Sequence, residues 1–210
     1  MKTAPPEIRA VIFDLGNVLA FHDNVKLFRE VSALFSAAPE ALKQRLEGSG
    51  VWDRVNRGQL RGDALRLELA DRLGVKPPPA DDFYRAWTCH FAINEPMVRH
   101  VEKLVGRVKL VLLSNTHDLH VQYLRPLLPV LERFDGLVLS CEVGLIKPEG
   151  EIYERALSVA GVPADRAVFF DDLEPYVVAA RKVGLHAHVF NDAREVPAQL
   201  AALGLPALID

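Results

Sequence analysis

Two segments of this 210-residue sequence place reactive side chains directly after runs of apolar residues. Asp14 follows the run Ala10–Phe13. Ser114 and Asn115 follow the run Lys109–Leu113. A carboxylate can act as a nucleophile, and hydroxyl and amide donors suit phosphate oxygens or a developing oxyanion. Taken singly, each of these residues is more often a turn residue or a helix cap.

Two further segments carry charge in the same kind of position. Lys147 stands directly before Pro148, which disfavours the helical conformation and predicts that the lysine lies on a loop. Asp171 and Asp172 follow the run Ala167–Phe170. A lone lysine is normally a solvated surface residue, and adjacent aspartates are commonly turn residues. The four signals in the order Asp, Ser, Lys, Asp-Asp are much harder to explain as turn chemistry.

The apolar runs themselves indicate how these side chains are positioned. Most of the runs are followed by helix-period stretches, which predicts a parallel sheet with helices on both faces. Ligands of such sheets bind beyond the carboxyl ends of the strands. The expected strands are Ala10–Phe13, Lys109–Leu113, Leu137–Leu139, Ala167–Phe170 and Ala187–Phe190.

The long gap between the first two runs predicts an inserted subdomain at about residues 22–93. Its pattern is helical, with glycines at 48 and 74 as helix stops that favour left-handed geometry. Phe83, Trp87 and Phe91 recur on one face, which favours a buried core over a ligand-stacking surface. Asn94 is expected to cap a returning helix, and a final helix is expected after Asn191. The helices predicted inside the insertion are Val25–Phe35, Pro39–Leu46, Asp63–Leu73 and Asp81–Phe91.

Composition excludes several classes of protein. A formal net charge of -3, with Lys and Arg spread along the chain, argues against nucleic acid as a partner. Cys89 and Cys141 lie far apart, which predicts neither a disulfide framework nor a zinc site. Residues 1–9 lack the apolar run of a signal peptide, and no stretch is long enough to span a membrane. We therefore expect a cytoplasmic protein.

The ordered motifs resemble the four signature motifs of the haloacid dehalogenase superfamily, in its phosphatase branch with a helical cap after the first strand. The Asp-x-Gly-Asn-Val form of residues 14–18 is similar to the glucose-1-phosphate phosphatase-like branch. The resemblance implies an α/β fold: a Rossmannoid, doubly wound parallel sheet with a small all-helical cap domain. The core would comprise residues 1–21 and 94–210, and the cap residues 22–93.

The resemblance also implies roles for the motif residues. Asp14 would be the nucleophile, and Lys147 would stabilise charge. Ser114 and Asn115 would bind the substrate's phosphate. Asp171 and Asp172 would form the acidic metal motif, and the cap would cover the site and select substrates.

A count of charges around Asp14 supports a metal cofactor. Carboxylates that converge on a phosphate dianion repel one another by ~4 kcal/mol per close pair at an effective dielectric constant of 20. One lysine does not neutralise that charge, whereas Mg²⁺ with oxygen ligands does. The preferred ligands are Asp14, the Gly16 carbonyl and Asp172, with Asp171 binding directly or through water.

The sequence departs from the family pattern at two positions. Gly16 stands where related phosphatases carry a second aspartate that protonates the leaving oxygen, and glycine cannot transfer a proton. His22 or Asp23 could supply it. Tyr176 stands where an asparagine is expected after the acidic pair, so a supporting hydrogen bond is either missing or made by the phenol. The seven histidines, which include the pairs 117/120 and 186/188, are assigned no metal.

The leading hypothesis is a hydrolase that removes phosphate from a small phosphomonoester, with a sugar phosphate as one candidate, through an aspartyl-phosphate intermediate with Mg²⁺. A haloacid dehalogenase is an alternative, but its chemistry needs no metal and leaves Asp171 and Asp172 unexplained. A phosphate- or metabolite-binding protein with weak or no turnover is a third reading, motivated by Gly16 and Tyr176. The expected partner is a small phosphorylated metabolite, bound by a monomer or homodimer.

Overall fold

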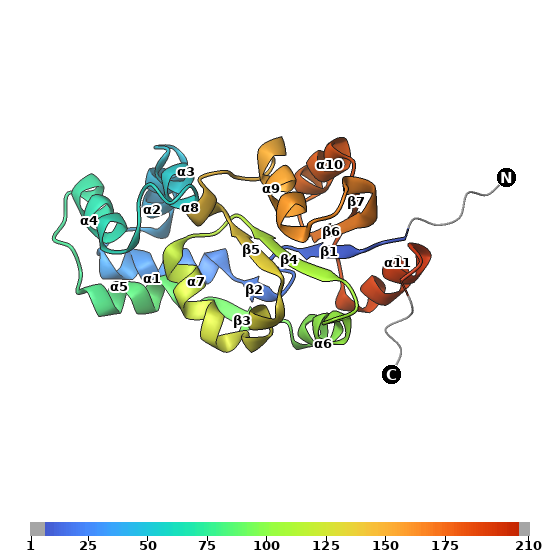
Figure 1. The fold of residues 1–210 in the computed structure, drawn as a ribbon. Helices are drawn as coiled ribbons and strands as arrows, with labels where there is room; N and C mark the ends of the chain where they lie inside the picture. Colours follow the sequence, from blue (N-terminus) through green and yellow to red (C-terminus); the bar gives the residue numbers. More distant parts are fainter. Residues whose placement is uncertain (1–6, 206–210) are drawn as a thin grey trace.

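The computed structural model describes residues 7–205 and is built on a five-stranded parallel sheet in the order β5-β4-β1-β6-β7 (Figure 1). Every neighbouring pair in this sheet is parallel. The predicted parallel sheet is therefore confirmed, and each predicted strand agrees with an observed one to within a residue at either end. The strands are β1 (Ala10–Phe13), β4 (Lys109–Ser114), β5 (Gly136–Leu139), β6 (Ala167–Asp171) and β7 (His186–Val189).

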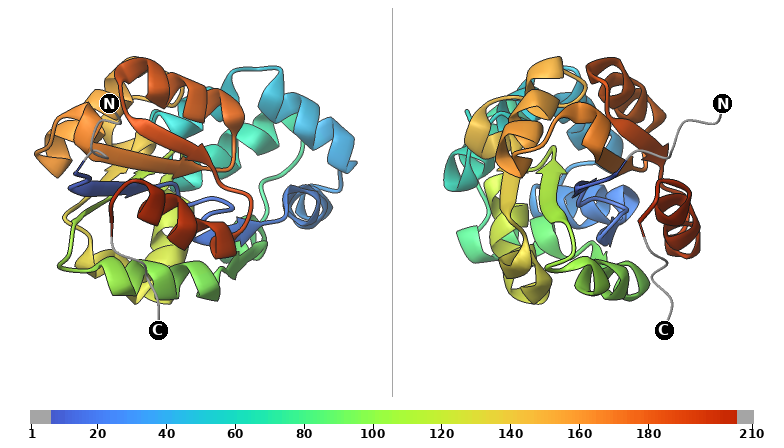
Figure 2. Two further views of the ribbon diagram at one scale, coloured as in Figure 1. Left: turned by 90° about the vertical axis from the view of Figure 1, so that its right-hand side faces the viewer. Right: turned by 45° about the vertical axis from the view of Figure 1, so that its right-hand side comes forward.

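Helices cover both faces of the sheet (Figure 2). In the central strand β1, Val11 and Phe13 belong to one buried cluster, whereas Ala10 and Ile12 belong to the other. Side chains alternate between the two faces of a strand, so β1 must be apolar throughout. The helices α6 (Glu95–Leu104), α7 (Asp118–Leu124) and α11 (Val196–Ala202) contribute to the first cluster, and α9 (Gly150–Ala160) and α10 (Glu174–Val183) to the second.

A helical insert separates β1 from β4 in the sequence. The chain enters and leaves it through an antiparallel pair, β2 (Ala20–His22) and β3 (Phe91–Ile93). Its helices and Leu119 of α7 enclose a separate buried cluster, in which Phe83 and Trp87 are fully buried. These helices are α1 (Asn24–Leu34), α2 (Pro39–Glu47), α3 (Val51–Asn56), α4 (Gly62–Leu73) and α5 (Ala80–Thr88).

Two details of the predicted insert are wrong. The helix expected over Asp81–Phe91 ends at Thr88, because Phe91 instead pairs with His22 across the β2–β3 ladder. Gly48 follows α2 with a φ of -83°, so it does not adopt the left-handed geometry that Gly74 does. The short helix α3 was not predicted.

The turn between α3 and α4 ties the insert to the sheet domain. Arg57 donates to the carboxylate of Glu149, and Arg61 donates to the carbonyl of Cys141. Gly58 adopts a φ of 68°, and a Cβ there would lie 1.9 Å from the Cys141 carbonyl oxygen. Only glycine fits this turn, because both its backbone angle and its clearance exclude a side chain.

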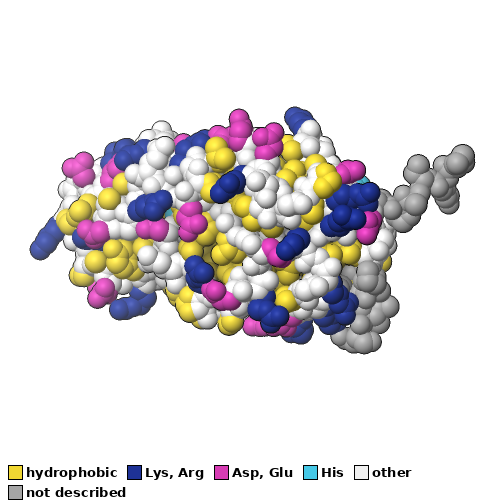
Figure 3. Space-filling model, viewed as in Figure 1, with side chains coloured by type: hydrophobic (Ala, Val, Ile, Leu, Met, Phe, Trp, Pro, Cys, Tyr) yellow, Lys and Arg dark blue, Asp and Glu magenta, His cyan; other side chains and the backbone are white. Residues whose placement is uncertain are grey.

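The surface carries charges of both signs, distributed over the face in Figure 3. Within residues 7–205, no helix combines the length and apolar character needed to cross a bilayer. The short helix α8 (Ser140–Val143) leads from β5 towards the loop that carries Lys147.

Candidate active site

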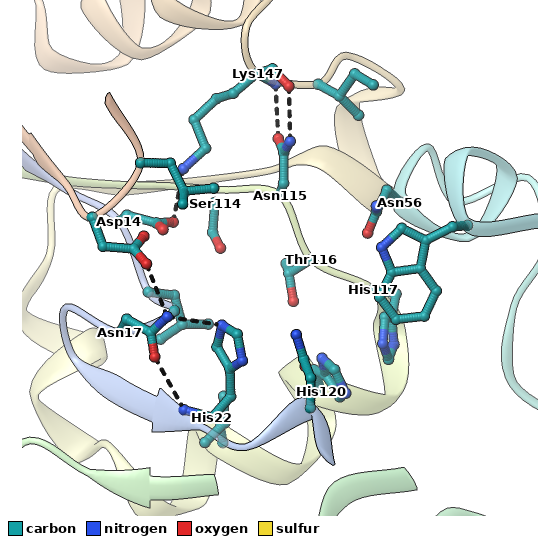
Figure 4. Close-up of a pocket in the computed structure, with 18 of the residues that line it drawn as sticks. Asp14, Asn17, His22, Asn56, Ser114, Asn115, Thr116, His117, His120 and Lys147 are labelled. Atoms are coloured by element: carbon teal, nitrogen blue, oxygen red, sulfur yellow. Dashed lines mark hydrogen bonds and ion pairs between the residues drawn. The ribbon is translucent and has the colours of Figure 1, made fainter. Parts of the chain in front are cut away.

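Three strand ends bring polar side chains together at the carboxyl edge of the sheet, and Figure 4 shows two of these side chains, Asp14 and Ser114. Asp14 follows β1, Ser114 ends β4, and Asp171 ends β6. Because β1 lies between β4 and β6, these residues are neighbours despite their separation in sequence. The Asp14 amide donates to the carbonyl of Phe170 at 2.9 Å, which continues the β1–β6 ladder into the site. All three polar side chains are buried.

Lys147 reaches this edge on the loop before α9, as the sequence predicted, but it is only 1% exposed. Its Nζ lies 2.9 Å from Asp14 Oδ1 and 2.5 Å from Asp171 Oδ2. The Asn115 side chain holds the loop: its Oδ1 accepts from Lys147 N at 2.8 Å, and its Nδ2 donates to Lys147 O at 2.9 Å. Asn115 therefore positions the lysine through its side-chain amide.

Burial sets the protonation behaviour of this cluster. It raises the pKa of Asp14, and it raises the pKa of Asp171 to about 6, although the Lys147 ammonium opposes both shifts. Burial lowers the pKa of Lys147, but Asp14 and Asp171 outweigh that effect and raise it above its ordinary value. The lysine therefore stays charged.

The carboxylate cluster fits a hard divalent cation. Asp14, Asp171 and Asp172 each offer an oxygen, and these oxygens lie within 4.8 Å of one another. Asp14 Oδ1 is buried without a hydrogen bond, although the Lys147 ammonium is close by. The Asn17 amide donates to Asp172 Oδ2 at 2.8 Å and so orients that carboxylate. Carboxylate oxygens of this kind suit Mg²⁺, and the residues present would hold it.

Gly16 lines the same pocket, beside the imidazole of His22. A Cβ at position 16 would lie 3.3 Å from His22 Cδ2, so the ring occupies the space that an aspartate side chain would enter. His22 Nε2 lies 3.2 Å from Asn17 Nδ2, which only donates, so this nitrogen acts as the acceptor. Asp23 caps α1 by accepting from Lys26 N. Of the two suggested proton sources, His22 lines the pocket and Asp23 does not.

Tyr176, which stands where an asparagine was expected, lies beside Asn115 and Lys147. Its hydroxyl lies 3.4 Å from Asn115 Nδ2, which donates to it, and its ring centroid lies 5.0 Å from Lys147 Nζ. The Tyr153 hydroxyl donates to the Tyr176 carbonyl at 2.9 Å and helps to fix the start of α10. Tyr176 therefore contacts Asn115 through its hydroxyl and Lys147 through its ring.

A pocket of about 640 Å³ joins this edge of the sheet to the insert. Its far wall consists of residues that sequence reasoning did not assign to the site. The histidine spacing at 117 and 120 places two imidazoles on the same side of the chain, but nothing in the sequence pairs them with Trp52 or His90. These wall residues include Trp52, Asn56, His90, Phe91, His117 and His120.

The family profile of haloacid dehalogenase-like hydrolases matches residues 8–184, which include every motif residue described above. The chain belongs to this hydrolase family. The Asp, Ser, Lys and Asp-Asp signals all lie within the matched residues, and the fold gathers them at one edge of the sheet.

Several relatives of this haloacid dehalogenase-like hydrolase are known. The sesquiterpene phosphatase astK of Aspergillus oryzae is 27% identical over 180 residues, which cover 84% of this chain and 87% of that protein. The D-ribitol-5-phosphate phosphatase of Bacteroides thetaiotaomicron is 24% identical, over 84% of this chain and 89% of that protein. A haloacid dehalogenase family enzyme of Bacteroides thetaiotaomicron, solved with magnesium and inorganic phosphate, has the same fold. Its TM-score is 0.78 at 22% identity, over 88% of this chain and 96% of that one.

The pocket histidines predict that this hydrolase loses stability in acid. Burial lowers the pKa of His117 to about 3 and that of His90 to about 4, from 6.5. Below pH 6.5 the unfolded chain takes up protons that the folded chain does not, so each histidine removes about 1.4 kcal/mol of unfolding free energy per pH unit as the pH falls. Urea unfolding at pH 7, 6 and 5 measures this slope.

Burial raises the pKa values of Asp14 and Asp171, so these two carboxyls add to the unfolding free energy as the pH falls. A variant of His117 is therefore needed to isolate the contribution of that histidine. His117→Gln should flatten the pH dependence by about one proton relative to the unsubstituted protein. Identical slopes for the two proteins would contradict the assignment of His117 as a buried neutral imidazole.

Proposed function

We propose that this protein hydrolyses small phosphomonoesters with Mg²⁺, through a phosphoryl group carried transiently on Asp14. The observation that supports this most strongly is the cluster of Asp14, Asp171 and Asp172 around one buried lysine, at the sheet edge where the family motifs meet. The insert at about residues 22–93 would act as a cap that selects the substrate.

In this reaction Asp14, Ser114 and Lys147 have different roles. An Asp14 carboxylate oxygen attacks phosphorus, the bond from phosphorus to the alcohol oxygen breaks, and the alcohol oxygen takes up a proton from water. Water then attacks the phosphoryl group, which releases inorganic phosphate and restores the carboxylate. The Ser114 hydroxyl holds a phosphate oxygen, and the Lys147 ammonium offsets the charge that builds up beside Asp14. Asp14, Asp171 and Asp172 would hold a Mg²⁺ ion, which would supply the remaining positive charge.

Both curated relatives named above are phosphatases, and each aligns with most of this chain. Their names describe very different alcohols, so they support phosphate removal and leave the alcohol open. The dehalogenase alternative is less well supported, because a reaction without metal does not explain why Asn17 orients the Asp172 carboxylate. Gly16, beside a His22 nitrogen that accepts a hydrogen bond, favours a modest rate with leaving groups that need a proton.

Removal of the metal tests the proposed function. Chelation with EDTA should reduce the release of phosphate from 4-nitrophenyl phosphate to background, because two buried carboxylates would then face the phosphate dianion with only Lys147 to offset them. Readdition of Mg²⁺ should restore the activity. Circular dichroism before and after chelation checks that the fold is unchanged.

The outcomes of this assay separate the three hypotheses. Undiminished hydrolysis after rigorous metal removal would contradict the proposal. Magnesium-dependent binding of a phosphate ester without phosphate release would indicate a binding protein. Release of chloride from 2-chloropropionate without metal would indicate a dehalogenase.

A further inference from the structure

The pocket contains few charged side chains, and a single lysine is the cation among them. Within the described part of the chain, the lysine, arginine, aspartate and glutamate residues of the lining are Lys147, Asp14, Asp53 and Asp172. Lys147 is 1% exposed and already contacts the carboxylates of Asp14 and Asp171. It therefore belongs to the strand edge and offers no free positive charge to the rest of the pocket.

Four histidines line the pocket and add no positive charge to it. Burial lowers the pKa of His90 to about 4 and that of His117 to about 3. Burial also holds the pKa of His120 well below 6.5. His22 Nε2 accepts from Asn17 Nδ2 at 3.2 Å, which a doubly protonated ring could not do. All four imidazoles are therefore uncharged in this arrangement.

The rest of the lining is uncharged, whether it is polar or apolar. Its leucines, isoleucine and aromatic rings suit hydrocarbon groups, and its asparagines, serine and threonine suit hydroxyl groups. Neither kind of side chain can neutralise an anion. The lining therefore accommodates both hydroxyl and hydrocarbon groups, and the property on which it discriminates is charge.

Asp53 places a negative charge on the insert side of the pocket. Trp52, Asp53 and Asn56 all line the pocket, and their spacing of i, i+1 and i+4 puts them on one side of α3. Figure 4 shows Asn56 across the pocket from Asp14. The Asp53 side chain is 53% exposed, so its carboxylate is accessible. An incoming substrate must approach this carboxylate.

Arg57 does not cancel this charge, because two carboxylates share its guanidinium. Its Nε donates to Asp53 Oδ2 at 3.0 Å, its Nη1 donates to Glu149 Oε2 at 3.2 Å, and its Nη2 donates to Glu149 Oε1. Nη1 also donates to the Gly144 carbonyl at 3.1 Å. Every nitrogen of the guanidinium is thus engaged. Two carboxylates against one guanidinium leave a net negative charge on the group of Asp53, Arg57 and Glu149.

We propose that the protein selects phosphomonoesters whose alcohol part carries no second anionic group, and that Asp53 rejects such a group. This inference rests on the proposed phosphatase function and specifies its substrate class. A carboxylate or second phosphate would lose its hydration in a pocket whose described lining offers no free cation, and it would also approach a like charge. Uncharged alcohols avoid both costs.

Three six-carbon phosphate esters that differ only at carbon 1 test this selectivity. Glucitol 6-phosphate carries a hydroxyl group there, 6-phosphogluconate a carboxylate, and 1-amino-1-deoxyglucitol 6-phosphate an ammonium group. With Mg²⁺ at neutral pH, kcat/KM for the hydroxyl and ammonium esters should each exceed that for 6-phosphogluconate by roughly 10-fold or more. Equal values, or a preference for 6-phosphogluconate, would overturn the inference.

The substitution Asp53→Asn isolates the charge of this side chain. Asparagine keeps the shape of aspartate and leaves Arg57 balanced by Glu149 alone. The ratio of kcat/KM for glucitol 6-phosphate to that for 6-phosphogluconate should therefore fall by roughly 3-fold or more. An unchanged ratio would refute the role of Asp53.

Asp63→Asn is the matched control for this variant. Asp63 is also an aspartate in the first turn of an insert helix, it pairs with Arg66, and its side chain is 49% exposed. It does not line the pocket. The Asp63→Asn protein should keep the substrate ratio of the unsubstituted protein, and a fall as large as that of Asp53→Asn would make the effect one of net charge.

Salt dependence separates electrostatic rejection from rejection by shape. The Debye length shortens from about 10 Å at about 0.1 M ionic strength to about 3 Å at about 1 M. The ratio for the unsubstituted protein should therefore fall as NaCl is raised over this range, and the ratio for Asp53→Asn should change less. A ratio that does not depend on salt would contradict the inference.

Binding measurements keep this inference separate from the proposed function. If the unsubstituted protein releases phosphate from none of the three esters and not from 4-nitrophenyl phosphate, the proposed function fails. The dissociation constants of the same esters, measured calorimetrically with Mg²⁺ on the Asp14→Asn variant, still decide the substrate class. 6-Phosphogluconate should bind most weakly of the three, and equal or tighter binding of it would refute the selectivity.

Discussion

Replacing Asp14 by asparagine abolishes phosphate release while the fold is retained; this is the result we expect. An amide is not a nucleophile towards phosphorus, and loss of a nucleophile typically costs at least about 10⁴-fold in kcat. Asn has nearly the same shape as Asp, and the backbone bond from residue 14 to the Phe170 carbonyl does not involve the side chain. Phosphate release from 4-nitrophenyl phosphate with Mg²⁺ measures the loss.

The matched control for this variant is Asp165→Asn. Asp165 is exposed and lies in the short helix before β6, at the opposite end of that strand from Asp171. It should retain full activity. Full turnover by Asp14→Asn, or a phosphate mimic such as beryllium fluoride bound away from Asp14, would end the assignment of the nucleophile.

Lys147→Met is the substitution with the largest expected effect on stability. Methionine fills a similar volume but leaves Asp14 and Asp171 buried without their ammonium partner. Removal of one partner from a buried ion pair typically costs about 3–5 kcal/mol of unfolding free energy. Urea unfolding at pH 7.5 without metal measures the loss. The loss should shrink towards pH 5, because burial already raises the pKa of Asp171 to about 6 and both carboxyls can protonate.

Lys182→Met provides the comparison for this variant. Lys182 is exposed near the end of α10, so its replacement should change the unfolding free energy by only a few tenths of a kcal/mol, which reflects the helix end. If the Lys147→Met protein is as stable as the Lys182→Met protein at pH 7.5, the loss of the ammonium group beside Asp14 and Asp171 costs no stability, which would contradict the prediction.

The sheet and its motif-bearing edge could be predicted because their signals are local. The strand β1 is apolar at every position, and the polar residue that follows it must emerge at the strand's carboxyl end. The same holds for Ser114 after β4 and Asp171 at the end of β6. Their meeting point follows from the family resemblance, and the strand order confirms it.

The far wall of the pocket could not be predicted because its contacts are long-range. The tautomer of His117 depends on Trp87, 30 positions earlier in the chain and on a different element. Phe91 continued the helical spacing of Phe83 and Trp87, but strand pairing with His22 placed it in β3. The burial of Lys147 likewise depends on the carboxylates of Asp14 and Asp171, which lie far away in the sequence. The local sequence, a lysine before a proline, predicted a loop but did not predict this burial.

The evolution of a roomier pocket is constrained at the turn that carries Gly58. The contact between Gly58 and the Cys141 carbonyl is made by backbone atoms, so no substitution by a smaller side chain can relax it. A smaller residue in place of Trp52 would enlarge the pocket, but it would not increase the distance between the insert and the sheet. A descendant that accepts bulkier substrates must therefore lengthen or rebuild residues 57–61, and insertions in this turn are the expected genetic route to them.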